Sequence, residues 1–299
     1  MSVTTSISTS TVRKGALIAT GSAMCYASAV VFIRNAYRAG ITPGTAVFLR
    51  FALASIALVA FLRLTRHWTP LPRRQTVALF LLGFLAYTLL GVTWFEALNV
   101  APAWLISLFV ALYPLSINLG SWLFLKEPLR RQQVMALVAV LTGGVILFAR
   151  PLEAVAWKGI LLMTINMIIQ TAYVLVGQRW TRGAPPVMSA TWQILGAMIG
   201  TFFYAWLSGQ LSFAFEAEGW IWASLFAVFS TALAIMMLWW GIGLLGPGRA
   251  AIFGSIEPFF SILLAVTFLG ERMMPSQAVG GALILLGMFL AQWEPMSDR

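Results

Sequence analysis

The residues of this sequence that could take part in chemistry are one carboxylate and one guanidinium inside long apolar segments. Glu257 lies within the apolar segment of residues 249–269, and Arg50 lies within that of residues 44–64. At a helical rise of 1.5 Å per residue, Arg50 is about 9 Å from the start of its segment. Ionisable side chains at depth in a membrane usually face a cavity or a partner, so both are candidate site residues, and Glu257 is the obvious carboxylate for coupling to protons. A structural ion pair between them is the alternative.

Pro114 and Pro258 are the two prolines that fall well inside apolar segments. A proline removes one backbone donor and clashes with the preceding turn, which exposes carbonyl groups that lipid cannot satisfy. Both prolines lie about 14–18 Å from the start of their segments, close to the midplane of a bilayer. We therefore expect a helix break that borders a cavity at this level. A kink that only shapes helix packing is the alternative.

Aromatic and polar side chains recur at mid-segment and are predicted to line the same cavity. They offer π faces, hydroxyls and an amide with little fixed charge, which suits a neutral, zwitterionic or partly apolar solute. Belts of Trp and Tyr at membrane interfaces, or plain packing, are the alternative for each residue. The predicted lining residues are Tyr26, Tyr87, Trp94, Tyr113, Gln170, Tyr173 and Trp240, with Asn166 and Trp239 as further mid-segment residues.

Membrane-spanning helices are the elements that must position these residues. The 299 residues are 60% hydrophobic and 9% charged, whereas soluble domains average about 45–50% apolar and about 25% charged residues. One helical span needs about 20 apolar residues. Apolar runs bounded by charge, Pro or Gly predict an all-α integral membrane protein with ten transmembrane helices, at residues 15–34, 44–64, 75–97, 102–124, 132–149, 157–178, 187–207, 219–242, 249–269 and 276–293.

The net charge of +10 comes from short basic runs between the apolar segments, which indicates topology signals rather than a surface for nucleic acid. With ten spans, thirteen lysines and arginines fall on the side of the termini and five fall opposite. Basic loops favour the cytoplasm, so we predict a multi-pass protein of the plasma (inner) membrane with both termini inside. Cys25 and His67 are the sole cysteine and histidine, so no metal, cofactor or disulfide is predicted.

The second half of the sequence is predicted to be a diverged copy of the first. A shift of 144 residues matches Lys14-Gly15 with Lys158-Gly159, Pro114 with Pro258, and Glu127 with Glu271. Each copy holds five spans, an odd number, so the second copy enters the membrane inverted. Chance matching among Leu- and Gly-rich helices is the alternative. The predicted boundaries are a polar tail at 1–12, a first repeat at 13–150, an inverted second repeat at 151–293 and a C-terminal tail at 294–299.

These features resemble the drug/metabolite transporter superfamily of the EamA type. The motifs that carry the resemblance are Phe48-Leu49-Arg50-Phe51, the turn Ala97-Leu98-Asn99-Val100-Ala101-Pro102-Ala103, and the span ends Glu127-Pro128 and Gly270-Glu271. Ile194 stands opposite Arg50 in the second half, and Gly246-Pro247-Gly248 replaces the Ala-Pro turn. The resemblance covers residues 13–293.

Within that superfamily the chain is most similar to bacterial exporters of amino acids, including aromatic amino acids. The resemblance implies that Tyr26, Tyr87, Tyr113, Gln170 and Trp240 line a central cavity. An exporter tuned to aromatic amino acids would carry an aromatic side chain at position 170, so Gln170 implies broader or more polar cargo.

We therefore expect an exporter of small metabolites, foremost amino acids, in which the two repeats rock about the level of Pro114 and Pro258. The sequence has no GxxxxGK[ST] motif, so a solute or proton gradient is the expected source of energy. Multidrug or other metabolite efflux on the same fold is the main alternative, and a channel is another. A membrane-embedded enzyme would need paired catalytic side chains, and a nucleotide-sugar transporter would need several deep basic residues. The sequence shows neither.

Overall fold

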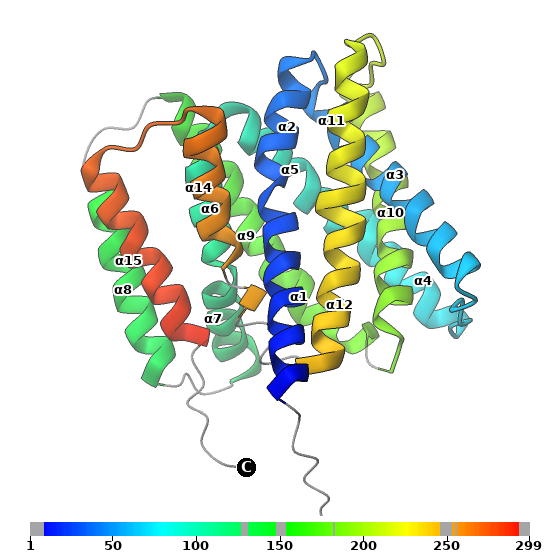
Figure 1. Ribbon diagram of the computed structural model, residues 1–299, viewed down its shortest axis with the longest axis horizontal. Helices are drawn as coiled ribbons and strands as arrows, with labels where there is room; N and C mark the ends of the chain where they lie inside the picture. Colours follow the sequence, from blue (N-terminus) through cyan, green and yellow to red (C-terminus); the bar gives the residue numbers. More distant parts are fainter. Residues whose placement is uncertain are drawn as a thin grey trace, which may run out of the picture.

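The computed structural model describes residues 9–126, 131–147, 154–181, 183–245, 253–254 and 256–292. Throughout this part of the chain the regular structure is helical, without strands. The helices lie side by side in one bundle, and the start of the first helix and the end of the last lie at the same end of it (Figure 1). The motifs Glu127-Pro128 and Gly246-Pro247-Gly248 lie outside the described residues.

The helices of the first half follow the predicted spans, with three interruptions that the apolar pattern does not predict. They are α1 (Thr9–Ala27), α2 (Ala29–Arg38), α3 (Pro43–Leu64), α4 (Arg73–Leu82), the π-helix η1 (Gly83–Tyr87), α5 (Thr88–Val100), α6 (Ala103–Ala111), α7 (Tyr113–Leu125) and α8 (Arg131–Leu147). Local chemistry sets several of the boundaries. Thr42 accepts the backbone N–H of Thr45 at 3.2 Å and Pro43 occupies the first turn, so α3 begins there.

The described elements of the second half follow the same order, with an unbroken first helix. Its elements are α9 (Ala154–Thr181), α10 (Pro186–Leu207), α11 (Ala217–Ala227), the π-helix η2 (Val228–Leu233), α12 (Ala234–Leu245), α14 (Glu257–Leu269) and α15 (Pro275–Gln292). Lys126 ends α7 at φ 57°, and Gly270, 144 positions later, ends α14 at φ 67°. Left-handed residues that close a helix C-terminus thus recur at equivalent positions of the two halves.

Six stretches of the described residues are long and apolar enough to cross a membrane. They are Val12–Arg38, Pro43–Leu64, Arg73–Val100, Ala103–Phe124, Trp157–Gly177 and Ala217–Leu238. The shorter apolar stretches Glu257–Leu269 and Ala278–Gly287 accompany them. The described part of the chain is therefore all-helical and contains several candidate spans.

The two prolines begin helices instead of kinking them. α6 ends at Ala111, and Pro114 lies in the first turn of α7; Pro258 likewise lies in the first turn of α14. A proline costs little there because the first N–H groups of a helix have no intrahelical partner. Pro114 lies inside the apolar stretch Ala103–Phe124, and the expected helix break lies beside it, between α6 and α7.

Hydrogen bonds between the halves are exchanged in a two-fold manner. Ser22 Oγ of α1 donates to the Ala234 carbonyl of α12 at 2.8 Å. Asn166 Nδ2 of α9 donates to the Leu90 carbonyl of α5, also at 2.8 Å. Asn166 follows Ser22 by 144 positions, and Leu90 precedes Ala234 by 144. Each half therefore contributes the same contact to the other, which is the signature of a two-fold relation between two copies.

Equivalent helices pack antiparallel. The start of α3 contacts Gln210, just beyond the end of α10. The Gln210 carbonyl accepts from Thr45 Oγ1 at 2.7 Å, and Gln210 Oε1 accepts from the Gly44 N–H at 2.8 Å. At the other end of this pair, the ring of Trp68 lies 6.1 Å from that of Trp192 near the start of α10. A two-fold axis that relates antiparallel helices must run across the bundle and not along it.

Glycines allow the backbones of α10 and of the α4–η1 segment to touch. A Cβ on Gly196 would lie 2.1 Å from the Phe80 carbonyl oxygen, and one on Gly200 would lie 2.7 Å from that of Phe84. Small residues at such contacts drive helix association in lipid, where burial of apolar area contributes little.

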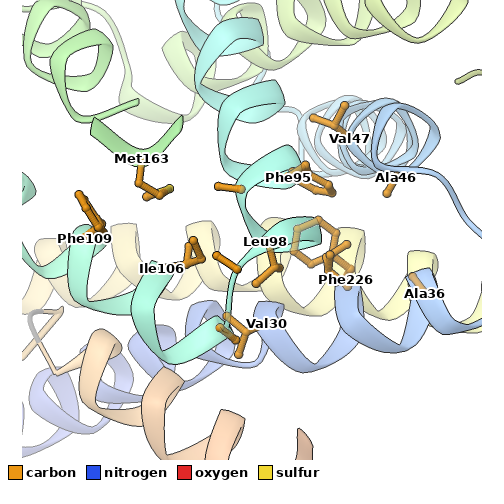
Figure 2. Close-up of a cluster of buried hydrophobic side chains, with 14 of the residues drawn as sticks. Val30, Ala36, Ala46, Val47, Phe95, Leu98, Ile106, Phe109, Met163 and Phe226 are labelled. Carbon is orange, nitrogen blue, oxygen red and sulfur yellow. The ribbon is translucent and has the colours of Figure 1, made fainter. Parts of the chain in front are cut away.

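A buried hydrophobic cluster joins helices of both halves. Phe95 of α5 and Phe226 of α11 meet edge to face, with ring centroids 5.6 Å apart. Val30 of α2 and Ile106 of α6 lie in the same cluster (Figure 2). These two residues also border the cavity described next, so the cluster fixes its walls.

Candidate functional site

A cavity of about 170 Å³ lies among helices of both halves. It gathers eight of the eleven predicted site residues: Tyr26, Arg50, Tyr87, Trp94, Tyr113, Gln170, Glu257 and Pro258. The remaining lining includes apolar residues and three serines, Ser107, Ser230 and Ser261. Residues spread from position 26 to position 261 thus share one site, which only the packing of ten separate elements makes possible.

Three predicted site residues are not part of the lining. Tyr173 stacks behind Tyr87, with ring centroids 5.7 Å apart and planes 12° from parallel, and its hydroxyl bonds to Gln193 Oε1. Pro114 begins α7 next to the lining residue Tyr113. Trp240 is 63% exposed on α12 and is not among the residues that line this cavity. The π-helix η2 precedes it and changes the helical register, which the plain 3.6-residue period does not anticipate.

The two π-helices are repeat-related features that bring lining residues to the cavity. η1 spans Gly83–Tyr87, and η2 spans Val228–Leu233, which corresponds to residues 84–89 after subtraction of 144. η1 carries Tyr87 and η2 carries Ser230, both of which line the cavity. π-helical turns inside α-helices occur often at functional sites. Nothing in residue type announces them, so the sequence analysis missed Ser230.

Arg50 and Glu257 line this cavity from different halves without forming an ion pair. Within the described part of the chain, the one ion pair is that of Arg34 with Glu271. The Arg50 guanidinium lies 5.3 Å from the ring centre of Phe51 and 5.1 Å from that of Phe226, while its buried Nε has no hydrogen-bond partner. The alternative of a structural ion pair between Arg50 and Glu257 therefore has no counterpart among the described contacts. The aromatic rings hold the guanidinium by cation–π attraction and leave its hydrogen-bond donors unused.

Tyr113 and Glu257 occupy equivalent positions, each directly before the proline that begins its helix. Tyr113 Oη donates to Asn166 Oδ1 at 2.6 Å. Asn166 also lines the cavity and is only 1% exposed. No described residue donates a hydrogen bond to the Glu257 carboxylate. The two halves thus present a satisfied hydroxyl at one position and an unsatisfied carboxylate at the equivalent one.

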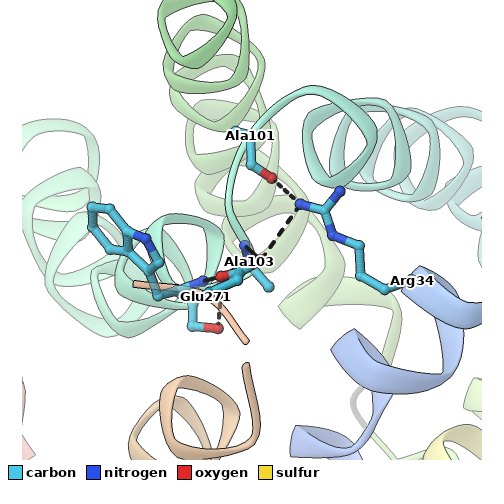
Figure 3. Close-up of polar contacts among 6 residues, drawn as sticks. Arg34, Ala101, Ala103 and Glu271 are labelled. Carbon is cyan, nitrogen blue, oxygen red and sulfur yellow. Dashed lines mark hydrogen bonds and ion pairs between the residues drawn. The ribbon is translucent and has the colours of Figure 1, made fainter. Parts of the chain in front are cut away.

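A second polar site closes the bundle at the end away from the described termini. Glu271 Oε1 accepts the backbone N–H of Ala103 at 2.8 Å, and Oε2 accepts that of Trp104 at 3.1 Å (Figure 3). The carboxylate thereby caps the first turn of α6, where N–H groups lack intrahelical partners. Arg34 Nη2 lies 3.7 Å from Glu271 Oε1 and also donates to the Ala101 carbonyl. One contact set thus joins α2, α6 and the end of α14.

These residues border an outer cavity of about 570 Å³. Arg38 and Arg272 line it together with Arg34 and Glu271, so its lining is cationic overall. The sequence analysis noted Glu271 only as a span end. Its role as a cap for α6 depends on a contact between residues 168 positions apart, which sequence spacing does not reveal.

Known proteins place this arrangement in a family. The model of the EamA-like transporter family matches twice, at residues 13–149 and 157–293. An uncharacterized transporter from Archaeoglobus fulgidus is 26% identical over 278 residues, which cover 91% of this chain and 94% of the relative. The uncharacterized transporter YyaM from Bacillus subtilis is 21% identical, with 84% of each chain covered.

Two further comparisons agree with this result. Protein PecM from Dickeya dadantii is 24% identical over 216 residues, which cover 72% of this chain and 73% of the relative. A solved structure described only as the crystal structure of a protein superposes with a TM-score of 0.67 at 20% identity, covering 93% of this chain and 98% of that one. At that identity the likeness concerns the fold alone. The resemblance expected from the motifs is confirmed: the chain belongs to the EamA-like transporter family and is a multi-pass membrane transporter with two copies of the family's repeat.

Proposed function

We propose that this protein exports amino acids across the plasma (inner) membrane. The observation that carries the proposal is the presence of Arg50 and Glu257 in one cavity with no ion pair between them. A charge without an ion-pair partner is costly within a membrane protein, so such a residue is a candidate for a functional role. An amino acid zwitterion offers a carboxylate for Arg50 and an ammonium group for Glu257, and the filled site then carries no net charge.

The rest of the lining supports a variable side chain on the cargo. Tyr26, Tyr87 and Trp94 offer aromatic surface, whereas Gln170 offers an amide on the same cavity. Such a mixture accepts apolar and polar side chains alike. We therefore propose several amino acids, and not aromatic ones alone, as cargo.

Alternating access is the proposed mechanism, with ten transmembrane helices as two inverted repeats and both termini in the cytoplasm. The repeats are proposed at residues 13–150 and 151–293. Support comes from the exchanged contacts of Ser22 and Asn166 and from the antiparallel packing of α3 on α10. A protein built from two copies in opposite orientations has two arrangements of similar energy that open to opposite sides.

Coupling to protons through Glu257 is part of the proposal. The titratable or charged groups that share its cavity are Tyr26 of α1, Arg50 of α3, Tyr87 of η1 and Tyr113 of α7. Protonation of Glu257 would remove the charge that holds the ammonium group and so release the cargo. Net amino acid uptake into proteoliposomes that is unchanged after the proton gradient is collapsed would exclude this coupling.

The decisive experiment is a competition panel on the reconstituted protein. Amino acids, sugars and cationic dyes compete for uptake into proteoliposomes, and we expect only amino acids to compete. Arg50→Gln and Glu257→Gln should each raise the half-saturating amino acid concentration at least about tenfold, the loss of one hydrogen bond to a charged group. Arg66→Gln, on an exposed turn, is the matched control. Dye transport without amino acid transport would favour multidrug efflux instead.

A further inference from the structure

We propose that Asn166 is a positioning residue that makes the Tyr113 hydroxyl an acceptor for a ligand's ammonium group, beside Glu257. The inference deepens the proposed function and takes from it only the amino acid as ligand. The need for a donor on the ligand follows from the direction of the hydrogen bonds around Asn166, and the positive charge follows from Glu257 in the same cavity.

Those directions are fixed by groups that can only accept. Asn166 Nδ2 donates to the Leu90 carbonyl at 2.8 Å and to Thr93 Oγ1 at 2.7 Å. A backbone carbonyl has no hydrogen to offer, so the amide nitrogen must face Leu90. The Thr93 hydroxyl already donates to the Leu89 carbonyl at 2.7 Å, so it too must accept from Asn166. The amide oxygen is thereby turned toward α7.

The Tyr113 hydroxyl must therefore act as the donor in its hydrogen bond with Asn166. The hydroxyl oxygen lies 2.6 Å from Asn166 Oδ1, an atom that can only accept, so Tyr113 must donate its one hydrogen there. What the phenolic oxygen retains for a ligand is lone-pair capacity alone. A ligand group that reaches this oxygen from the cavity must therefore bring its own hydrogen.

Glu257 adds a second acceptor to the same cavity. We call the Tyr113 hydroxyl and the Glu257 carboxylate together the acceptor edge. An ammonium group has three donors and no acceptor, so its hydrogen-bonding needs match two acceptors and no donor. A ligand carboxylate would be repelled by Glu257 and would find no hydrogen on Tyr113, which directs it toward Arg50.

The first half lacks an equivalent of this amide. Ser22 occupies the position equivalent to Asn166, and its hydroxyl donates to the Ala234 carbonyl at 2.8 Å. Its one hydrogen is therefore used between helices, as are both hydrogens of the Asn166 amide. Ser22 contributes only the contact between the halves, whereas Asn166 makes that contact and also orients Tyr113. The difference between the two residues separates a structural role from a positioning role.

The experiment compares three probes of similar shape on the full-length reconstituted protein. L-Phenylalanine carries both charged groups, phenethylamine carries only the ammonium group, and 3-phenylpropionate carries only the carboxylate. Binding is followed by quenching of intrinsic tryptophan fluorescence and transport by exchange. The variants are Asn166→Leu, Tyr113→Phe, the double variant, and Ser22→Ala as the matched control that removes the equivalent contact between the halves.

We expect Asn166→Leu and Tyr113→Phe each to raise the half-saturating concentrations of phenylalanine and phenethylamine about tenfold. The concentration for 3-phenylpropionate should not change, and the double variant should lose no more than either single variant. Ser22→Ala should leave the order of the three probes intact. Tyr113→Phe keeps the Asn166–Leu90 bond, so it still tests the contact of Tyr113 with the ammonium group if Asn166→Leu fails to fold.

Three results would overturn the role of Asn166: equal losses for all three probes, additive losses in the double variant, or the same selective loss in Ser22→Ala. A wild-type protein that prefers 3-phenylpropionate to phenethylamine would overturn it as well. Transport of phenethylamine without phenylalanine would instead refute the amino acid cargo and leave the role of Asn166 intact.

Discussion

Arg34 of α2 and Glu271, which follows α14, form an ion pair with 3.7 Å between Nη2 and Oε1, above the first turn of α6. The pair links the two halves at the end of the bundle away from the described termini (Figures 1 and 3). Because Glu271 also caps two N–H groups of α6, the contact holds three elements together by one carboxylate. Its removal should loosen that end of the cavity.

The substitution Glu271→Gln tests this link. It abolishes the ion pair and weakens the cap, effects worth about 1 kcal/mol together, which corresponds to about a fivefold change in an equilibrium. The reporter is Ser107→Cys in a Cys25→Ala background, because Ser107 lines the cavity. With Glu271→Gln added, this cysteine should react about fivefold faster than without it, when a membrane-impermeant thiol reagent is applied from the side of Glu271. Glu218→Gln is the control, because that carboxylate bonds only to Trp222 on its own helix. Equal labelling rates would show that the link does not hold that end closed.

Because α10 lies in close contact with the α4–η1 segment, we expect one added methyl group in this contact to lower the stability of the protein. Gly196→Ala would place a Cβ 2.1 Å from the Phe80 carbonyl oxygen, so the helices must separate. We expect a loss of about 1–3 kcal/mol in stability, measured as a lower midpoint of thermal unfolding in detergent. Gly254→Ala, with nothing within 4 Å of its Cβ, should leave the midpoint in place. The same midpoint for both variants would contradict the close approach.

Comparison of Arg50→Lys with Arg50→Gln separates the contribution of the planar guanidinium from that of the positive charge. Lysine at this position keeps a cation but loses the planar group that lies over Phe51 and Phe226 and can bond a carboxylate through two N–H groups. Arg50→Lys should therefore raise the half-saturating concentration of an amino acid, though less than Arg50→Gln does. The concentration for phenethylamine should stay unchanged in both variants. A selective loss of phenethylamine would place the carboxylate elsewhere.

Gln170 predicts cargo preference. Gln170→Trp replaces an amide on the cavity lining by a large aromatic surface. The ratio of transport efficiencies for phenylalanine over threonine should rise several-fold, measured by exchange in proteoliposomes. Trp240→Gln, on the exposed side of α12, serves as the comparison and should leave the ratio unaltered. An unchanged ratio in Gln170→Trp would remove position 170 from the part of the cavity that contacts the cargo side chain.

We expect Glu257 to make net amino acid uptake depend on pH. The side chain of Glu257→Gln is neutral at every pH, so any remaining net uptake should no longer depend on a pH difference across the membrane. The wild-type protein should show that dependence under the same conditions. A pH response that survives in Glu257→Gln would assign coupling to another group.

Much of the architecture could be predicted from the sequence because it depends on local properties. Apolar runs, charged boundaries and prolines are read residue by residue, and they locate the helices to within a few positions. The 144-residue shift pairs Tyr113 with Glu257 and Ser22 with Asn166 before any contact is known. The depth of Arg50 and Glu257 within apolar segments likewise follows from counting along a helix.

Only the tertiary structure decided what these residues do to one another. Whether Arg50 pairs with Glu257 depends on how α3 and α14 of different halves are placed, and the rings of Phe51 and Phe226 hold the guanidinium instead. The π-helices that bring Ser230 to the cavity and leave Trp240 outside it arise from packing and have no residue signature. The direction of the Tyr113 hydrogen bond is set by the carbonyls of Leu89 and Leu90, through Thr93 and Asn166. The sequence thus determined the depth and the chemical type of each group, because these are properties of one helix. Which groups contact one another, and which of them donates each hydrogen bond, depended on the packing of helices that are far apart in the chain.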